Sequence, residues 1–327
     1  MKAVIVKQPG GVEQLAISDV PDPQPSRGEL LVRVRASALN RADILQREGN
    51  YPPPPGASEI LGLDVAGTVE ETGSGCSTYR AGDRVFGLLP GGGYAQYALI
   101  PESMAMPIPE SLTFEQAAAV PEVFLTAFQT LFWIGRLEAG EAVLIHSGGS
   151  GVGTAAIQLA NAVDAAVLTT TGTDEKCQSC RALGAVRAIN YRSEDFADAV
   201  SEQTKGSGVH LILDFVAAPY WEKNISVLRT DGRMVLISLM GGSIADRVDL
   251  GQILRKRLQI TGTTLRGRSL EYKIRLTREF ADFAAERFAG GRLKPVIDSV
   301  FPWQQVAEAH QRMEANRNIG KIVLTID

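Results

Sequence analysis

A stretch of small residues in the middle of the chain has the composition of a phosphate-binding turn. Residues Ala142 to Ala160 read AVLIHSGGSGVGTAAIQLA: an apolar run, a turn with four glycines and an amphipathic run. The strict G-x-G-x-x-G fingerprint fails, because Ser150 stands where its second glycine belongs. Small residues still let backbone N–H groups and a helix N-terminus approach a phosphate, so the stretch predicts nucleotide binding. The alternative is a plain glycine-rich turn.

The ribose-binding position of such a site lies roughly 20 residues further on. There the sequence reads Thr169 to Thr173, TTTGT, with no carboxylate. A carboxylate would bind the ribose 2′-hydroxyl and repel a 2′-phosphate, so its absence favours NADPH, with Lys176 as the phosphate partner. In the alternative, Asp174 or Glu175 binds the ribose, or both only stabilise a helix start while Lys176 is solvated.

Alternating strand and helix patterns surround the glycine turn. Each apolar run of strand length is followed by a helical pattern, which indicates a parallel sheet with helices on both faces. The expected pairs are Ala142–Ile145 with Thr154–Ala162, Ala166–Thr170 with Asp174–Leu183, and Leu211–Phe215 with Trp221–Leu228. Further strands are expected at Met234–Leu239 and Gln259–Thr263.

The first 120 residues are instead mostly strand-like, with short apolar runs interrupted by Gly and Pro. In one of them Leu30, Val32, Val34 and Ala36 should share a buried face, with Leu31, Arg33 and Arg35 on the other. Thr113 and Gln116 have capping-box spacing, and one or two helices are expected in 113–133. The terminal KIVLTID reads as a strand returning to the first domain. A length of 327 residues also favours two domains.

Composition excludes several function classes. The net charge is −4, and Lys and Arg are scattered along the chain, so the sequence indicates no positively charged surface that would bind a long polyanion. We therefore do not expect a nucleic-acid partner. No apolar run approaches the roughly 20 residues of a spanning helix, so no membrane association is expected. Three cysteines and no signal-peptide pattern suit a reducing compartment, and we expect a cytoplasmic protein.

Several further motifs, taken together, resemble a known family. NRADILQREGNYPPPPG, LLPGGGYAQY, HSGGSGVGTAAIQLA, YWEKN, LMGG and EANRNIGKIVL occur in the order seen in the zinc-free quinone oxidoreductase branch of the medium-chain dehydrogenase/reductase superfamily. They are most similar to the tumour-suppressor-inducible quinone oxidoreductase subgroup. The resemblance covers nearly the whole chain. It implies a GroES-like, mostly β catalytic domain at 1–122, a Rossmann-type dinucleotide-binding domain at 123–265, and a return to the catalytic domain at 266–327.

The resemblance also implies the residues that would bind NADPH. The pyrophosphate would meet Ser150, Gly151, Val152 and Gly153; the 2′-phosphate Gly172, Thr173 and Lys176; the adenosine Tyr191. Thr126, Val216, Met240 and Asn318 match positions near the nicotinamide half. For Val216 and Met240 the alternative is simple core packing.

No metal is expected. Zinc-dependent relatives place a cysteine near Asn40 and a histidine followed by an acid near Leu63 and Asp64, and here the cysteine and the histidine are missing. The resemblance implies that Asn40, Asp43 and Tyr51 form the active-site loop and orient a quinone or a related electrophile. For Asp43 the alternative is a structural hydrogen bond or salt bridge, and for Tyr51 a loop anchor.

Two rival functions stay open. One is NADPH-dependent reduction of an activated C=C bond in an enoyl or enone substrate, with Tyr51 as proton donor. The other is a weakly catalytic relative that binds nucleotides or RNA. The resemblance further implies a homodimer in which the strand Leu258–Thr264 meets its copy across a two-fold axis.

Overall fold

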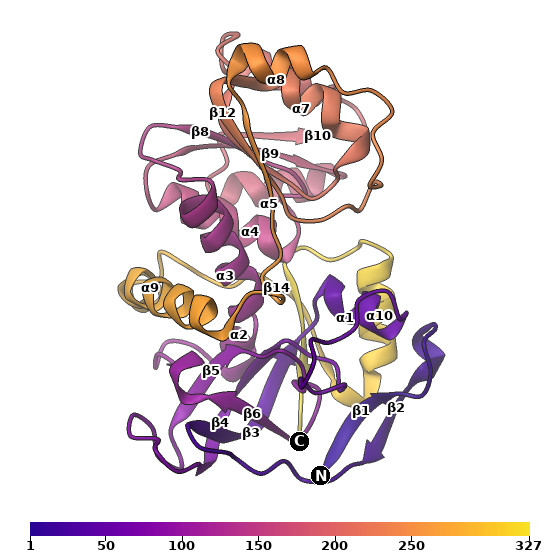
Figure 1. The fold of residues 1–327 in the computed structure, drawn as a ribbon, viewed down its shortest axis with the longest axis vertical. Helices are drawn as coiled ribbons and strands as arrows, with labels where there is room; N and C mark the ends of the chain where they lie inside the picture. Colours follow the sequence, from indigo (N-terminus) through magenta and orange to yellow (C-terminus); the bar gives the residue numbers. More distant parts are fainter. The chain divides into compact units, whose positions relative to one another are not determined.

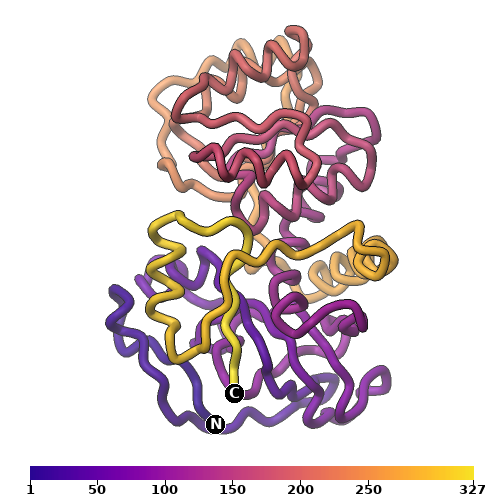
Figure 2. The backbone as a smooth tube through the Cα atoms, turned by 180° about the vertical axis from the view of Figure 1, so that it is seen from behind, coloured from indigo at the N-terminus to yellow at the C-terminus, as the bar shows by residue number.

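The computed structural model describes residues 1–327, and the chain passes twice through the first of its two units. Unit 1 comprises Met1–Leu125 and Arg266–Asp327, and unit 2 comprises Thr126–Leu265. The division falls within helix α3 (Pro121–Phe128). Both chain ends lie in unit 1, where the C-terminal segment runs back among the N-terminal strands (Figure 2).

A seven-stranded sheet forms the centre of unit 1, in the order β14-β15-β3-β4-β5-β7, with β6 paired to β3. Its strands are β3 (Glu29–Ala38), β4 (Asp64–Thr72), β5 (Arg84–Leu88), β6 (Tyr97–Pro101), β7 (Ala105–Pro107), β14 (Ile297–Pro302) and β15 (Lys321–Thr325). Strands β1 (Lys2–Val6) and β2 (Leu15–Asp19) pair separately. The predicted return of the final strand is confirmed, because β15 pairs antiparallel with β3, placing Val323 opposite Ala38.

Strand β3 shows the predicted alternation with one exception. Its even-numbered residues from Leu30 to Ala36 are buried, while Arg33 and Arg35 are exposed. The prediction that Leu31 shares the exposed face is wrong, since only 8% of Leu31 is exposed. At this end β3 has β4 on one side and β6 on the other, and its register with β4 shifts between Leu31 and Val32. Neighbouring strands therefore cover a position that alternation alone assigns to solvent.

The helices of unit 1 are α1 (Arg41–Arg47), α2 (Phe114–Ala118), α3, α9 (Leu270–Ala289) and α10 (Val306–Glu314). The predicted capping box is confirmed: the Gln116 N–H donates to Thr113 Oγ1 over 3.3 Å, and the Thr113 N–H donates to Gln116 Oε1 over 3.0 Å. The helical pattern of 113–133 is divided into α2, α3 and a π-helical turn at Gln129–Ile134.

Unit 2 is a six-stranded, all-parallel sheet in the order β10-β9-β8-β11-β12-β13. Figure 1 shows helices on both of its faces, which confirms the α/β prediction. The strands are β8 (Ala142–Ile145), β9 (Ala166–Thr171), β10 (Arg187–Asn190), β11 (Val209–Asp214), β12 (Leu228–Leu236) and β13 (Gln259–Gly262). The helices are α4 (Gly151–Asn161), α5 (Asp174–Ala182), α6 (Phe196–Gln203), α7 (Trp221–Val227) and α8 (Leu250–Lys256). Leu144, Leu168, Ile212 and Met234 bring four of the strands into one apolar core.

Two element boundaries differ from the sequence prediction. Helix α4 begins at Gly151, three residues before the expected Thr154, because Ser150 caps it. Strand β12 begins at Leu228 instead of Met234, directly after α7, and its first half carries exposed polar residues. The hydrophobic pattern of a sequence reveals only the buried part of a helix or strand, so an exposed or small-residue end is missed.

Candidate functional site

The glycine turn lies at the carboxyl end of β8, at the centre of the parallel sheet of unit 2. Its first residue after the strand is His146, and helix α4 begins at Gly151. In open parallel sheets ligands bind at this edge, where strands end and helices begin. The turn therefore occupies the position that a dinucleotide site requires.

Close packing explains why two of the glycines cannot carry a side chain. A Cβ on Gly153 would lie 2.4 Å from the Ser147 carbonyl oxygen, and one on Gly148 would lie 1.9 Å from Thr169 Oγ1. Both distances are far below contact. The turn is folded tightly against β9 and against the first turn of α4, which leaves its backbone within reach of a ligand.

Ser150 is the N-cap of α4. Its side-chain oxygen accepts the Gly153 N–H over 3.0 Å, while its hydroxyl proton stays available for donation. The Gly151 and Val152 N–H groups belong to the first turn, where a helix has no partners of its own. No acidic residue stands in that turn, so these groups fit an anionic pyrophosphate.

Four residues that the resemblance assigned to the 2′-phosphate and adenosine lie around the end of β9. A Cβ on Gly172 would be 2.7 Å from the Tyr191 hydroxyl oxygen, so the phenol lies against this glycine. Thr173 caps α5 by accepting the Lys176 N–H over 3.2 Å. The aliphatic part of the Lys176 side chain packs against Gly149: a Cβ added to Gly149 would lie 3.0 Å from Lys176 Cδ. The structure therefore places these four residues next to the glycine turn.

Asp174, one alternative ribose ligand, is already hydrogen-bonded. Its Oδ1 accepts the Asn190 side-chain amide over 2.8 Å, and Asn190 directly precedes Tyr191. The contact joins the start of α5 to the end of β10. It gives Asp174 a role in holding Tyr191 beside Gly172.

The residues assigned to the nicotinamide half are more widely spread along the chain. Val216 and Met240 lie in neighbouring loops, where the Met240 N–H donates to the Phe215 carbonyl and the Gly241 N–H donates to the Val216 carbonyl. Core packing is wrong for Met240, which is 55% exposed. Thr126 is buried on α3. Asn318 belongs to unit 1, where its side-chain amide donates to the Gly320 carbonyl over 2.8 Å.

A buried polar network beneath these loops was not found by sequence reasoning. His146 bonds through Nδ1 to Thr170 Oγ1 at 2.9 Å and through Nε2 to Asn224 Oδ1 at 2.7 Å. The Asn224 amide donates to Asp214 Oδ2 over 3.0 Å, and Asp214 Oδ1 accepts the Val216 N–H over 2.7 Å. Burial lowers the pKa of His146, so the imidazole is neutral. The network fixes the ends of β8, β9 and β11 relative to one another.

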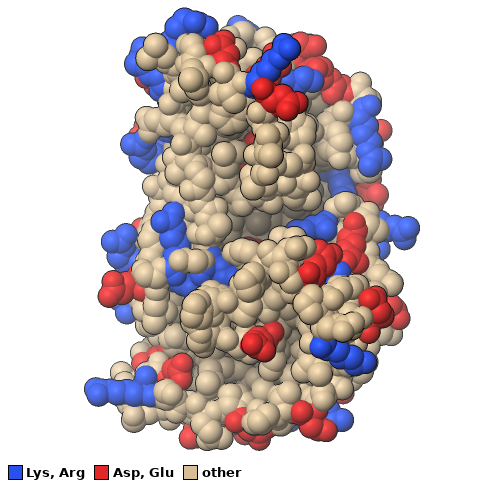
Figure 3. Space-filling model, turned by 45° about the vertical axis from the view of Figure 1, so that its right-hand side comes forward, with Lys and Arg blue, Asp and Glu red and all other residues tan.

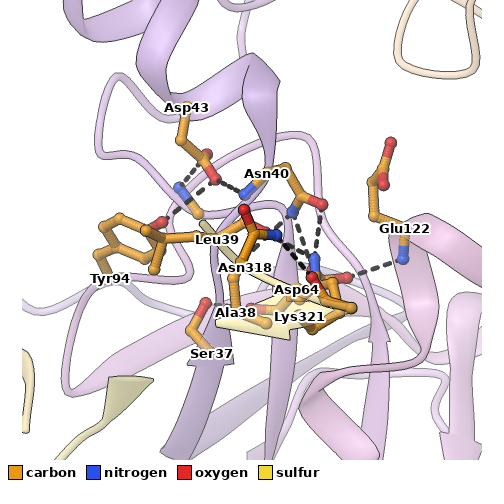
Figure 4. Close-up of polar contacts among 12 residues, drawn as sticks. Ser37, Ala38, Leu39, Asn40, Asp43, Asp64, Tyr94, Glu122, Asn318 and Lys321 are labelled. Carbon is orange, nitrogen blue, oxygen red and sulfur yellow. Dashed lines mark hydrogen bonds and ion pairs between the residues drawn. The ribbon is translucent and has the colours of Figure 1, made fainter. Parts of the chain in front are cut away.

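Unit 1 contains a second buried polar network, built around Asn40 at the start of α1 (Figure 4). Lys321, from β15, donates to the Leu39 carbonyl at 2.8 Å, to Asn40 Oδ1 at 2.6 Å and to Asp64 Oδ2 at 2.9 Å. The Asn40 amide donates to the same Asp64 oxygen over 2.8 Å, and the Glu122 N–H donates to Asp64 Oδ1 over 2.7 Å. Lys321 is 3% exposed and Asp64 fully buried.

This donor set does not fit a zinc ion. Asn40 and Leu63 stand where zinc-dependent relatives carry a cysteine and a histidine, and Leu63 offers no donor atom. All three protons of the Lys321 ammonium point to oxygens of this network, so a fixed positive charge lies among the groups that a cation would need. Zinc in proteins is held by sulfur, imidazole and carboxylate ligands. This centre offers no sulfur or imidazole, and its one carboxylate, Asp64, is paired with Lys321.

Asp43 lies one helical turn into α1 and is almost completely buried, at 1% exposed. Its oxygens accept the Asn40 N–H at 2.7 Å, the Gly62 N–H at 3.0 Å and the Tyr94 hydroxyl at 3.2 Å. Burial raises its pKa to about 6, although the two backbone N–H groups act in the opposite direction. Burial also raises the pKa of Tyr94 well above the ordinary value. Asp43 therefore makes structural hydrogen bonds, as the alternative interpretation expects, and their donors are two backbone N–H groups and the Tyr94 hydroxyl.

Tyr51 is the most accessible of the three predicted active-site residues. It is half-buried, and the Arg266 guanidinium carbon lies 5.4 Å from its ring centroid. Burial raises the pKa of Tyr51, and the Arg266 charge opposes the shift. The phenol therefore stays protonated at neutral pH.

Charge on the molecular surface is mixed. On the face drawn in Figure 3, basic and acidic side chains occur in small groups separated by uncharged areas. No helix of the chain has both the length and the apolar character needed to cross a bilayer.

Two family models match the chain. Residues 26–110 match an alcohol dehydrogenase GroES-like domain, and residues 151–282 match a zinc-binding dehydrogenase. The human protein named quinone oxidoreductase is 33% identical over 332 residues, covering 100% of this chain and 98% of that protein.

Solved structures agree with this grouping. An NAD-dependent alcohol dehydrogenase superposes with a TM-score of 0.88 at 31% identity, with 100% of both chains covered. A mycobacterial protein complexed with NADPH gives a TM-score of 0.87 at 30% identity, covering 99% of this chain and 100% of that one. The CurK enoyl reductase gives 0.86 at 26% identity, covering 100% and 99%.

Proposed function

The chain belongs to the quinone oxidoreductase branch of the medium-chain dehydrogenase/reductase superfamily, and we propose that it reduces quinones with NADPH without using a metal ion. The choice of a quinone as the acceptor rests on one observation. The Lys321 ammonium lies between Asn40 and Asp64, where zinc-dependent relatives hold their metal. Quinones are electron-poor and need no Lewis acid, so they suit a centre of this kind.

The glycine turn and the end of β9 would hold the cofactor. First-turn N–H groups of α4 would bind the pyrophosphate, with a hydrogen bond from the Ser150 hydroxyl. Lys176 and Thr173 would bind the 2′-phosphate, and Tyr191 would cover the adenosine beside Gly172. Thr126, Val216, Met240 and Asn318 would contact the nicotinamide half. NADPH bound in this way supplies a hydride to the acceptor.

The residues of unit 1 would orient the acceptor. Asn40 is held by Lys321 and Asp64, and Asp43 fixes the backbone of Asn40 and Gly62, so we assign Asp43 a positioning role. Tyr51, partly accessible and protonated, would contact the acceptor or pass it a proton through water. We accordingly assign 1–122 and 266–327 to the catalytic domain and 123–265 to the dinucleotide-binding domain.

Enoyl or enone reduction is the second candidate, and Tyr51 is the observation in its favour. A protonated phenol can donate to a developing enolate, and the CurK enoyl reductase shares this fold. Oxidation of NADPH should be followed with a naphthoquinone and with an enoyl thioester. We expect turnover of the quinone, and turnover of the thioester alone would reject the proposal.

Cofactor preference needs its own measurement, because a solved relative is described as NAD-dependent. Titration of protein fluorescence should give tighter binding of NADPH than of NADH, and Lys176→Glu should reverse the order. Equal affinities in the unaltered protein would contradict the assignment of Lys176. A gel-shift assay with RNA at moderate salt tests the nucleic-acid alternative, and we expect no shift.

We also propose a cytoplasmic homodimer formed through the edge of unit 2. Strand β13 ends the parallel sheet, and helix α8, which directly precedes it in the chain, carries two exposed apolar residues: Leu250 at 69% and Leu254 at 79%. Unpaired edges and apolar patches are features of association surfaces. Light scattering at micromolar concentration should give twice the chain mass, and Leu254→Asp should lower it. A monomer would reject the proposal.

A further inference from the structure

Arg266 is a buried arginine held by two parts of unit 1 far from it in sequence. Its side chain is 8% exposed. Nε and Nη2 donate to the Pro90 carbonyl at 3.1 and 2.8 Å, and Nη2 also donates to Gln46 Oε1 at 2.7 Å. Three of its five N–H bonds therefore have acceptors, and the guanidinium plane is fixed in place.

The remaining two N–H bonds, both on Nη1, have no acceptor although the atom is buried. Arg266 also makes no salt bridge with a carboxylate. A buried donor without a partner destabilises the folded protein, because its hydrogen bonds to water are lost. Asp43 makes no hydrogen bond with Arg266, although its charge opposes the lowering of the Arg266 pKa by burial. The contacts of Nε and Nη2 fix the guanidinium plane and with it the position of Nη1, but they give the two N–H bonds of Nη1 no acceptor.

Two neighbours show what kind of group would complete this site. The Tyr51 ring lies against the guanidinium and is partly exposed, so the cluster can be reached from the Tyr51 side. Lys273, in the first turns of α9, donates to the Arg266 carbonyl over 3.2 Å and brings a second positive charge. The charge of Arg266 contributes to lowering the pKa of Lys273, after the larger effect of burial. A negatively charged oxygen is the missing partner.

We propose that Arg266 Nη1 binds the acceptor oxygen on which negative charge develops during reduction. This inference rests on the proposed function, because it assigns the group that stabilises the reduced quinone. The acceptor gains a hydride, a proton with two electrons, from the bound dihydronicotinamide, and one of its carbonyl oxygens becomes an oxyanion. Water then supplies the proton that completes the hydroquinone. Because Nη1 is buried and the Tyr51 ring lies against the guanidinium, this contact requires the ring to move aside.

Kinetics of Arg266→Gln test the proposal with NADPH and 1,4-naphthoquinone. We expect kcat/KM to fall about 100-fold, mainly through kcat, because the contact forms as charge develops. Arg266→Lys keeps the charge and should recover part of the loss. Arg278→Gln, on the exposed side of α9, removes the same charge and should leave kcat/KM within twofold. Near-normal kcat in Arg266→Gln would overturn the proposal.

A binding measurement separates this inference from the proposed function. The hydroxynaphthoquinone 2-hydroxy-1,4-naphthoquinone is an anion at neutral pH, and with NADP⁺ no hydride is available. Fluorescence titration should show that Arg266→Gln weakens its binding at least tenfold while the Kd of NADP⁺ and the melting temperature change little. If the unaltered protein reduces no quinone, the proposed function fails, yet this affinity difference still supports the anion site. Equal affinities in both proteins would refute the site.

Discussion

The two units each contain a buried polar network with a carboxylate, and the networks differ in the groups that pair with it. In unit 2, the neutral imidazole of His146 is hydrogen-bonded to Thr170 and Asn224, and the Asn224 side-chain amide in turn donates to Asp214. In unit 1, the ammonium of Lys321 is held between Asn40 and Asp64, with every proton donated. In unit 2 the buried Asp214 carboxylate accepts hydrogen bonds from uncharged groups, whereas an ion pair is at the centre of unit 1.

The difference corresponds to what each network supports. Asp214 and its partners position loops whose backbone would meet a cofactor, and there uncharged donors to the Asp214 carboxylate suffice. The unit 1 network must hold Asn40 in place among groups that hold a metal in zinc-dependent relatives. A lysine there supplies positive charge with fixed directions, and it connects the last strand of the chain to the first third of the sequence.

Removing the charge at the centre of unit 1 should give the largest effect. Lys321→Met leaves the buried Asp64 carboxylate without its positively charged partner, which we expect to cost about 3–5 kcal/mol of unfolding free energy. Urea unfolding in a Trp133→Phe/Trp221→Phe background reports on unit 1 alone, because Trp303 is then the only tryptophan.

The matched change in unit 2 is Asn224→Leu, which unpairs His146 and one oxygen of Asp214. We expect a smaller cost, about 2 kcal/mol, because the removed group is neutral. Lys321→Arg, which keeps the positive charge, should fall between Lys321→Met and the unaltered protein. A cost for Lys321→Met no greater than that for Asn224→Leu would show that the charge does not distinguish the two networks.

Asp43 in unit 1 and His146 in unit 2 should make contributions of opposite sign to the pH dependence of stability. Asp43 has a pKa of about 6 when folded, against about 3.9 for an unfolded aspartate. Its contribution is fully present below pH 4 and is lost as pH rises through 6, by about 3 kcal/mol. Burial lowers the pKa of His146, so its contribution is present above 6.5 and is lost as pH falls.

Urea unfolding between pH 4 and 7, followed by Trp303 in unit 1, isolates Asp43 when the unaltered protein is compared with Asp43→Asn, because His310 titrates in both proteins. The stability difference between the unaltered protein and Asp43→Asn should fall with rising pH and level off above 6.5. A difference that does not vary with pH would mean that Asp43 titrates normally.

Local sequence predicted the unit 2 site better than the unit 1 site, for a physical reason. The glycine turn, the cap at Ser150 and the Thr173–Lys176 segment are contiguous, so spacing alone places them at strand ends. Lys321 and Asp64 are 257 positions apart, and a lysine at the start of an apolar strand gives no sign of burial. Arg266 stands near Arg268 with nothing local to tell the buried side chain from its neighbour. Asn40 and Asp43 were found only through the resemblance.

Some details of the predicted site also depend on tertiary contacts. The sequence placed Ser150 at the pyrophosphate, and its role as a helix cap became visible only with the position of Gly153. Met240 has an apolar side chain of the kind found in cores, but it is exposed because it lies in the loop after β12. In both cases the residue type was informative, while its partner was set by the fold.

The smallest predicted effect separates the two roles of Ser150. Ser150→Ala removes the cap and should cost about 1 kcal/mol of unit 2 stability, whereas Ser150→Gly should cost only a few tenths. If the hydroxyl also donates to the pyrophosphate, both variants lose NADPH affinity equally, despite their different stabilities. Ser150→Thr keeps a hydroxyl and should retain both properties. Fluorescence titration with NADPH and urea unfolding measure the two quantities. Affinity that follows stability across the three variants would leave Ser150 as a cap alone, and phosphate binding would then rest on the backbone of α4.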